Sequence, residues 1–404
     1  MGDKKTSLLI KNCKAYINGR LENKNILIIN GKISKITNKL PKAKKTLNAK
    51  GNIVIPGAID CHVHFREPGL THKGDFLTES RAAAKGGITT VLDMPNTIPP
   101  TTTIKDLEEK RKSARKSVVN YGFHFGSTLE NLQEIRKAKG IASVKVYMDY
   151  TTGDLKIDDY NVVEKIMKMS KVTSFHAESE HARDIINIIK KKRIKNKAYF
   201  CHISSEKELN YIKDAKLKNV FVEVTPHHLF MTDKHIQELG AFAEMKPRLK
   251  SFKDQKTLWN GVKKGMIDTI ATDHAPHTKE EKREANYPFG VPGVETMLPL
   301  LLDAFNNKRM DLKDIVRLCC ENPARIFGII RKGAIKEGFD ADLTIVDIKK
   351  RQLINANELL TKCGWSPFEG RMLRGWPVTT IINGSLVYHK NVVYYKKGEE
   401  VEFS

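Results

Sequence analysis

The sequence predicts an α/β protein in which eight strand–helix units close into a (βα)8 TIM barrel flanked by a β-sandwich domain. Short apolar strand-like segments alternate with helix-like segments between residues 56 and 330. Such alternation favours a parallel sheet, and the span fits the length of about 250 residues typical of these barrels. Residues 1–55 and 331–404 are instead rich in strand-like segments. We expect these two ends of the chain to pair into one discontinuous sandwich.

The terminal segments read as strands because they are short, apolar and bounded by turn signals. Asn-Gly pairs, which favour two-residue hairpin turns, occur at residues 18–19, 30–31 and 383–384. The predicted terminal strands are 7–12, 15–17, 25–29, 32–36, 52–55, 341–347, 378–382 and 386–388.

Within the barrel each predicted strand is followed by a helical or loop segment. The predicted strands are 58–64, 88–94, 118–126, 143–148, 172–176, 197–202, 220–225 and 268–273. The predicted helices are one that ends near residue 86, then 104–117, 129–139, 158–170, 179–192, 205–216, 254–264, 293–306 and 311–328.

Length, composition and charge limit the classes of protein to which the chain can belong. The chain of 404 residues is 40% hydrophobic, enough for one large and one smaller domain. It has no apolar run of about eighteen residues, and its first residues lead into a strand, so we expect a cytoplasmic protein with no membrane partner. The net charge of +23 fits either nucleic-acid binding or a lysine-rich surface around a small anionic substrate. We favour the second interpretation, because aromatic residues are not interleaved with the lysines.

The first barrel strand carries a candidate metal-binding pair. In a strand over 58–64, Asp60, His62 and His64 alternate onto one face, and Arg66 continues it. Two imidazoles two residues apart on a strand can bind one metal ion from the same side. A His-x-His pair alone is only modest evidence for a metal site. The residues at the ends of the other predicted strands are needed to support that interpretation.

Polar side chains follow several of the other predicted strands. The active site of a TIM barrel lies where its strands end, so these side chains are expected to converge there. They are Asn96, Lys145, His176, His202, Asp273 and His277. Imidazole and carboxylate ligands suit a divalent ion such as Zn²⁺, and their number fits two ions better than one. An ammonium beside two cations is repulsive, so Lys145 must be neutral or chemically changed.

The chain has six cysteines and no Cys-x-x-Cys pair, which argues against a zinc ribbon. Cys61 and Cys201 each precede a candidate ligand histidine. Strand alternation is expected to turn both thiols away from the ligands and into the core.

Together these motifs resemble the metal-dependent amidohydrolase superfamily, and within it the dihydroorotases. The resemblance covers the whole barrel and extends into the flanking segments. The segments that carry it are 60–69, 93–97, 144–147, 175–178, 201–202, 225–229 and 272–278.

The resemblance implies a role for each strand-end residue. One Zn²⁺ is held by His62, His64 and Asp273, and a second by His176 and His202, with N6-carboxylated Lys145 bridging the two. The implied substrate contacts are His64, Arg66, Asn96 and His277, with the backbone of Phe289 and Gly290 touching the ring amide. An arginine offers a two-pronged donor to a carboxylate, which agrees with an acidic substrate.

The implied activity is the reversible cyclisation of N-carbamoyl-L-aspartate to L-dihydroorotate in de novo pyrimidine (UMP) biosynthesis. A metal-bound hydroxide attacks the ring carbonyl, and Asp273 acts as general base and then as general acid. An allantoinase or a hydantoinase-type cyclic amidase is the alternative within the superfamily, and Arg66 with Asn96 argues against it. A non-catalytic scaffold is a third alternative, which the complete ligand set argues against.

Three features stay open at this stage. The loop at Thr151 and Thr152 is either a lid over the substrate or an ordinary solvated loop. His227 and His228 match no ligand position and are interpreted as supporting or structural residues. Some relatives associate with aspartate transcarbamoylase, but no segment of this chain is recognisable from the sequence as a docking site for it.

Overall fold

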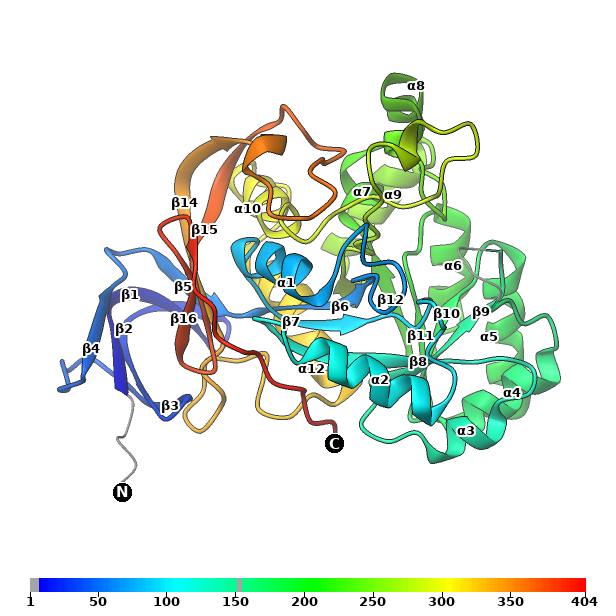
Figure 1. The fold of residues 1–404 in the computed structure, drawn as a ribbon, viewed down its shortest axis with the longest axis horizontal. Coiled ribbons are helices and arrows are strands. Elements are labelled where there is room, and N and C mark those ends of the chain that lie inside the picture. Colours follow the sequence, from blue (N-terminus) through cyan, green and yellow to red (C-terminus); the bar gives the residue numbers. More distant parts are fainter. Residues whose placement is uncertain (1–6, 151–154) are drawn as a thin grey trace.

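A computed structural model describes residues 7–150 and 155–404. Eight parallel strands form one sheet whose order follows the chain from β6 to β13 (Figure 1). They are β6 (Ala58–Val63), β7 (Ile88–Asp93), β8 (Asn120–Gly126), β9 (Ser143–Tyr147), β10 (Val172–His176), β11 (Lys197–Phe200), β12 (Val220–Val224) and β13 (Thr269–Ile270). The predicted barrel is confirmed, with each strand inside its predicted limits.

The last strand meets the first through a short contact. The backbone N–H of His64 donates to the carbonyl oxygen of His274 over 2.8 Å. The Asp60 carboxylate accepts from the Thr272 backbone N–H at 3.0 Å and from its hydroxyl at 2.5 Å. Asp60 therefore binds the two strands together, and it does not join His62 and His64 as the alternation predicted.

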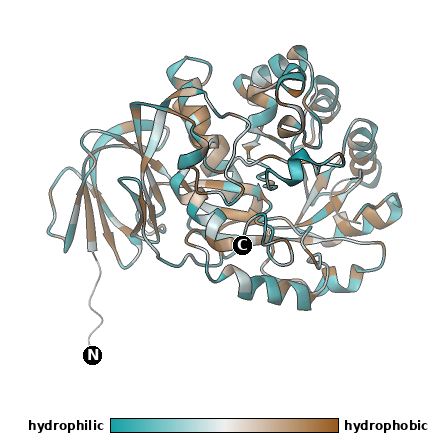
Figure 2. Cartoon of the chain, turned by 45° about the horizontal axis from the view of Figure 1, so that its top comes forward, coloured by the Kyte–Doolittle hydropathy of each residue, from teal (hydrophilic) through white to brown (hydrophobic). Residues whose placement is uncertain are grey.

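Helices cover the outside of the barrel (Figure 1). Three of them begin with a capping box, at Asp75, Thr103 and Ser205, in which side chain and backbone satisfy each other's polar groups. Figure 2 shows hydrophobic residues along the barrel strands and a mixed pattern on the helices, as amphipathic packing requires. The α-helices are α1 (Phe76–Lys85), α2 (Ile104–Ala114), α3 (Leu132–Lys137), α4 (Tyr160–Met169), α5 (Glu180–Lys192), α6 (Glu206–Asp214), α7 (Pro226–Phe230), α8 (Lys234–Leu239), α9 (Phe252–Lys263), α10 (Met297–Asn306), α11 (Leu312–Val316) and α12 (Asn322–Phe327).

Several short helical turns complete the set. A π-helical turn, η3 (Arg317–Glu321), joins α11 to α12, so the predicted helix over 311–328 is one interrupted helix. The interruption precedes Pro323, which cannot donate a backbone hydrogen bond. The remaining turns are the 3₁₀ helices η1 (Gly240–Ala243), η2 (Glu281–Arg283) and η4 (Ala356–Glu358).

The two ends of the chain form one nine-stranded sheet beside the barrel. Its N-terminal strands are β1 (Ser7–Ile17), β2 (Arg20–Ile29), β3 (Lys32–Thr37), β4 (Lys45–Asn48) and β5 (Ile53–Pro56), and its C-terminal strands are β14 (Leu343–Leu353), β15 (Met372–Ile382), β16 (Ser385–His389) and β17 (Val392–Val393). β5 pairs with β14, which joins the two halves as predicted. Both share one apolar core, to which Ile10, Val54 and Leu343 belong.

The hairpin turns explain the register of this sheet. In all three Asn-Gly pairs both residues have positive φ: 49° and 85° at residues 18–19, 50° and 80° at residues 30–31, and 47° and 71° at residues 383–384. This is the type I′ geometry that fits the twist of a hairpin. The predicted turns are therefore confirmed. β4 was not predicted.

The chain enters the barrel after β5 and leaves it after α12. Its last residues return to the barrel, where the Val401 backbone N–H donates to the Tyr121 carbonyl oxygen over 2.8 Å. Domain limits at residues 56 and 330 stay a prediction. No helix in the described part of the chain has the length and apolar character needed to span a membrane.

Candidate active site

The structure brings the predicted strand-end residues to one end of the barrel. Each of them lies in the last three residues of a parallel strand or in the segment that follows it, and such strands all end on the same side of a sheet. All are buried: His62, His64, Arg66, Asn96, Lys145, His176, His202, Asp273 and His277.

Three of these residues have left-handed backbone conformations. The φ angles are 69° for Arg66, 38° for His202 and 48° for Asp273. Positive φ is uncommon for residues other than glycine and gathers at functional sites. Regular pairing of β11 and β13 stops at Phe200 and Ile270, before these turns. The turns thus set the direction of the ligand side chains, and simple strand alternation does not predict it.

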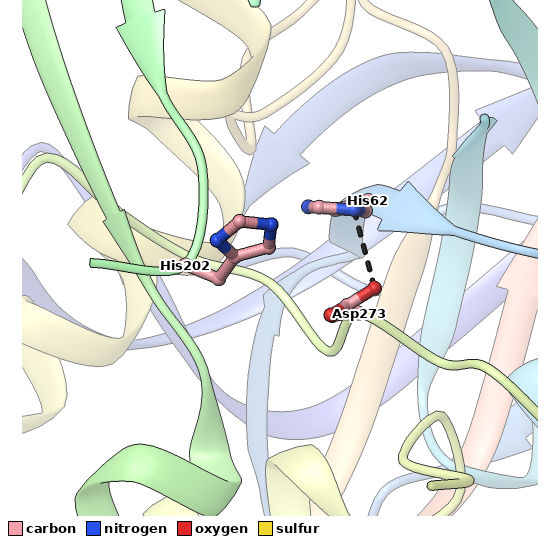
Figure 3. Close-up of side chains that lie close together, drawn as sticks. All are labelled: His62, His202 and Asp273. Atoms are coloured by element: carbon pink, nitrogen blue, oxygen red, sulfur yellow. Dashed lines mark ion pairs between the residues drawn. The ribbon is translucent and has the colours of Figure 1, made fainter. Parts of the chain in front are cut away.

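Asp273 lies between the two histidines of the first strand. Its Oδ1 atom is 2.9 Å from His64 Nε2 and 3.2 Å from His62 Nε2. His202 points into the same space (Figure 3), and donor atoms of His62, His202 and Asp273 lie within 4.8 Å of one another. This donor set fits a divalent metal ion.

His176 and His202 form the other side of the cluster. Their ring centroids are 4.5 Å apart. His202 Nδ1 is buried and has no hydrogen-bond partner among the residues that the structure describes. A buried polar atom without a partner is costly. An unpartnered imidazole nitrogen beside a second histidine is therefore a further sign that these residues fit a metal.

Lys145 is fully buried below the histidines. Its Nζ atom is 2.9 Å from Cys201 Sγ and 5.2 Å from the centre of the Tyr147 ring. The ion pairs between described residues, among them Lys110 with Asp93, do not include Lys145. The prediction that Cys201 is buried is confirmed, but it turns toward the site rather than away from it. Phe200 and Cys201 alternate about β11, and this alternation places the thiol inside the barrel.

Glu223 anchors the first histidine. Its Oε1 atom is 2.8 Å from His62 Nδ1 and accepts from the His202 backbone N–H at 2.8 Å. Burial alone lowers the pKa of His62, but the carboxylates of Glu223 and Asp273 outweigh it and raise that pKa well above 6.5. Burial raises the pKa of Asp273, yet His62 and His64 together hold it well below 3.8. The electrostatic potential between His62 and Asp273 therefore favours a bound cation.

Replacing Glu223 by Gln is expected to lower the metal affinity of the protein by about 10- to 100-fold, because a ligand histidine loses the carboxylate that orients it. Competition with a chromophoric chelator measures this affinity. Glu180→Gln, at the start of α5 where the side chain is 45% exposed, is the control. Equal affinities in the Glu223 variant and the control would contradict the role given to Glu223.

The predicted substrate contacts line one small pocket beside this cluster. His64, Arg66, Asn96, Phe289 and Gly290 all contribute to its wall, together with Asp273. His277 stands directly behind, with Nε2 at 2.9 Å from Arg66 Nη2 and 3.0 Å from the Phe289 carbonyl oxygen. His64 Nδ1 is 2.6 Å from Asn96 Oδ1, and the other ring nitrogen of His64, Nε2, faces Asp273.

Arg66 is the cation of this pocket. Burial lowers the pKa of Arg66 to about 10, with Asp273 and Asp93 opposing the shift, so the guanidinium stays charged near neutral pH. A buried guanidinium with one edge on a pocket suits an anionic ligand. The pocket therefore joins a carboxylate-binding group to a metal-binding cluster.

Some residues of the site were not predicted from the sequence. Met245 and Lys246 line the same pocket, and Glu223 supports the cluster. Glu223 could have been found as the one charged residue inside a strongly apolar strand. No comparable signal in the sequence marks Lys246, because it lies in a segment that forms no strand or helix in which a charged residue would be unusual.

The two histidines of α7 differ from each other. His228 bonds to Thr225 Oγ1 at 2.8 Å and to the Pro247 carbonyl oxygen at 3.1 Å, which agrees with a structural residue. His227 is buried beside it, and its Nε2 atom has no hydrogen-bond partner in the described residues. The predicted loop at Thr151 and Thr152 lies outside the described residues.

A larger cavity, of about 810 Å³, lies at the opposite end of the barrel. It is lined by residues where strands begin, such as Ser143 and Val172, and includes none of the predicted site residues. Size alone does not mark the reactive site, because the convergent donors and the buried arginine lie elsewhere.

Comparison with known proteins agrees with this geometry. The sequence profile of the Amidohydrolase family matches residues 53–387, most of the chain. The chain belongs to the amidohydrolase family. Curated relatives include the dihydroorotase of Methanosarcina acetivorans, 38% identical over 96% of this chain and 93% of the relative, and the dihydroorotase of Pyrococcus abyssi, 38% identical over 96% and 97%. The resemblance stated from the motifs is confirmed.

Solved structures support the same fold for this amidohydrolase. The L-hydantoinase (dihydropyrimidinase) from Arthrobacter aurescens has a TM-score of 0.93 at 28% identity, covering 98% of this chain and 99% of its own. The dihydropyrimidinase from Brevibacillus agri has a TM-score of 0.91 at 23% identity, covering 99% of each chain, and bears on the fold alone. Family membership makes the protein a hydrolase acting on a small molecule, and implies metal dependence.

Proposed function

We propose that this amidohydrolase is a dihydroorotase, which interconverts N-carbamoyl-L-aspartate and L-dihydroorotate in pyrimidine biosynthesis. The observation that carries the proposal is the buried Arg66 in one pocket with Asp273 and His64. A carboxylate held at Arg66 places the attached ring beside the metal-binding cluster. The relatives named dihydroorotase support the same conclusion.

The donor set supports two Zn²⁺ ions. His62, His64 and Asp273 would hold one ion, His176 and His202 the other, and N6-carboxylated Lys145 would bridge them. Bound there, the ions would polarise the ring carbonyl and lower the pKa of a water molecule. A buried lysine that forms no ion pair with the described carboxylates is costly as an ammonium, and carboxylation of Lys145 would remove that cost.

Replacing Lys145 by Met is expected to remove most of the bound metal, because the variant cannot form the bridging carbamate. Elemental analysis of the purified protein measures zinc per chain, about two in the wild type and fewer than one in the variant. Lys139→Met, at an exposed position, is the control for loss of charge alone. Two zinc ions per chain in the Lys145 variant would contradict the bridging role.

Separate residues of the protein bind the substrate and transfer the proton during ring opening. Arg66, Asn96 and His277 hold the substrate carboxylate, and the Phe289–Gly290 backbone contacts the ring amide. Asp273 takes a proton from the attacking water as the new C–O bond forms. As the C–N bond breaks, Asp273 returns that proton to the amide nitrogen. Cyclisation runs through the same steps in reverse and releases water.

A hydantoinase-type amidase is the second candidate, since the L-hydantoinase from Arthrobacter aurescens shares the fold closely. Arg66 opposes it, because a cyclic amide without a carboxylate leaves a buried guanidinium without its partner. Purified zinc-loaded protein, incubated separately with N-carbamoyl-L-aspartate, allantoin and hydantoin, decides between them. We expect conversion of the first and little of the other two. Turnover of allantoin or hydantoin alone would overturn the proposal.

Two expectations stay predictions. They are a cytoplasmic location and an association with aspartate transcarbamoylase.

A further inference from the structure

Lys73 lies behind the pocket and contacts none of the proposed metal ligands. It is 8% exposed, in the segment between β6 and α1. Its Nζ atom is 3.1 Å from His277 Nδ1 and 2.9 Å from Glu281 Oε1. The ion pair with Glu281 keeps Lys73 protonated, although burial lowers its pKa from 10.5.

This contact determines which nitrogen of His277 carries the proton. Burial and the charges of Arg66 and Lys73 lower the pKa of His277 far below 6.5, so the ring is neutral and has one N–H. Lys73 at Nδ1 and Arg66 at Nε2 can both only donate, so the nearby acceptors decide between the two nitrogens. Glu281 Oε2, at 3.7 Å, is too far to accept from Nδ1. The Phe289 carbonyl oxygen, 3.0 Å from Nε2, is within reach and accepts, so the proton lies on Nε2 and Nδ1 accepts from Lys73.

The tautomer has a consequence for Arg66. Arg66 Nη2 is 2.9 Å from His277 Nε2. With the proton on Nε2, both groups are donors, and two donors at this distance cannot bond to each other. An anion placed beside them would accept from Arg66 and would take over the Nε2–H of His277 from the Phe289 carbonyl oxygen. Arg66 Nη2 therefore finds an acceptor on this side only when an anion is bound.

We propose that Lys73 is a positioning residue that fixes the Nε2–H tautomer of His277, so that His277 and Arg66 bind the carboxylate of the substrate together. The identity of this carboxylate rests on the proposed function, whereas the tautomer does not. Without Lys73, Arg66 can donate to a deprotonated Nε2, and Nδ1 takes the proton. The substrate would then lose one donor and compete with His277 for the other.

Three variants test the proposal in the zinc-loaded protein. Lys73→Met removes the donor to Nδ1 with little change in side-chain length. Lys73→Arg keeps a cationic donor. His72→Gln is the matched control, because His72 also contacts Glu281, at 3.1 Å, but its side chain is 57% exposed and does not reach His277. Circular dichroism and thermal unfolding establish that each variant is folded.

The tautomer is measured by ¹H–¹⁵N NMR of ¹⁵N-histidine-labelled protein, with His277→Asn identifying the His277 signals. We expect the Nε2–H form in wild type, His72→Gln and Lys73→Arg, and the Nδ1–H form in Lys73→Met. For L-dihydroorotate, KM should rise about tenfold in Lys73→Met with kcat changed less than about threefold, and Lys73→Arg should restore most of the affinity.

The Nε2–H form in Lys73→Met, with KM near that of wild type, would overturn the proposal. A change of KM and kcat together without a change of tautomer would show a structural role only, and would also overturn it. A wild-type protein that does not turn over dihydroorotate would refute the proposed function, while the NMR measurement would still decide the role of Lys73.

Discussion

Replacing Asp273 by Asn is expected to lower kcat for dihydroorotate hydrolysis by about 10³-fold, the middle of the range for loss of a general acid–base group. Asp273 Oδ1 lies within 3.2 Å of both His62 Nε2 and His64 Nε2, so the residue stands where proton transfer and metal binding meet. An amide of the same shape keeps an oxygen for these contacts but cannot accept the proton.

Zinc content must be measured in the same preparation, because loss of metal would also lower kcat. Asp268→Asn is the matched control, since Asp268 precedes the same strand at its other end and contacts Lys213 there at 3.0 Å. It is expected to affect stability more than turnover. A zinc-loaded Asp273→Asn protein with near-normal kcat would remove Asp273 from the mechanism.

Replacing Arg66 by Met is expected to lower kcat/KM for dihydroorotate by about 10²-fold or more. Each hydrogen bond to a charged group contributes about 1.5–3 kcal/mol, and a guanidinium can make two such bonds to a carboxylate. For dihydrouracil, the same ring without the carboxylate, kcat/KM should stay within about threefold, because no group of that substrate uses Arg66.

Steady-state kinetics with both substrates measures this effect. Arg248→Met, which removes an exposed guanidinium paired with Glu244, controls for loss of positive charge near the pocket. An equal fall for the two substrates would mean that Arg66 supports the structure of the pocket and does not recognise the carboxylate.

Much of the fold could be predicted because local signals agree with the final structure. The apolar strands of the barrel and the Asn-Gly turns act within a few residues, so they can be read from the sequence. β4 was missed, since its partner β1 is distant in sequence and its own residues are exposed or half-buried. α7 and α8 were also missed, because they are only five and six residues long.

The site was predicted through topology. Parallel strands end on one side, so the residues following them could be expected to meet. The directions of the individual side chains could not be predicted in this way, because Arg66, His202 and Asp273 adopt positive φ. Asp60 was placed wrongly because alternation holds only inside regular strands, and β6 has two irregularities in its pairing. Cys201 was placed wrongly because it follows the alternation of β11 into the barrel, and His202, with its positive φ, is the residue that departs from it.

Supporting residues were the least predictable. Glu223 is 161 positions from His62, and Lys73 is 204 positions from His277, yet each pair is in contact. Only the closed barrel brings them together. Such contacts depend on the whole fold, so a single sequence offers at most a charged residue in an unusual place, as it does for Glu223.

The ratio of kcat/KM for L-dihydroorotate to kcat/KM for dihydrouracil, measured on the wild-type zinc-loaded protein, tests the central claim most directly. The two substrates differ only in the carboxylate that Arg66, Asn96 and His277 are proposed to bind. A site built to bond a polar group rejects an analogue that lacks it by large factors. We predict a ratio of about 10³ or more. A ratio near one, or a preference for dihydrouracil, would contradict the assignment as a dihydroorotase.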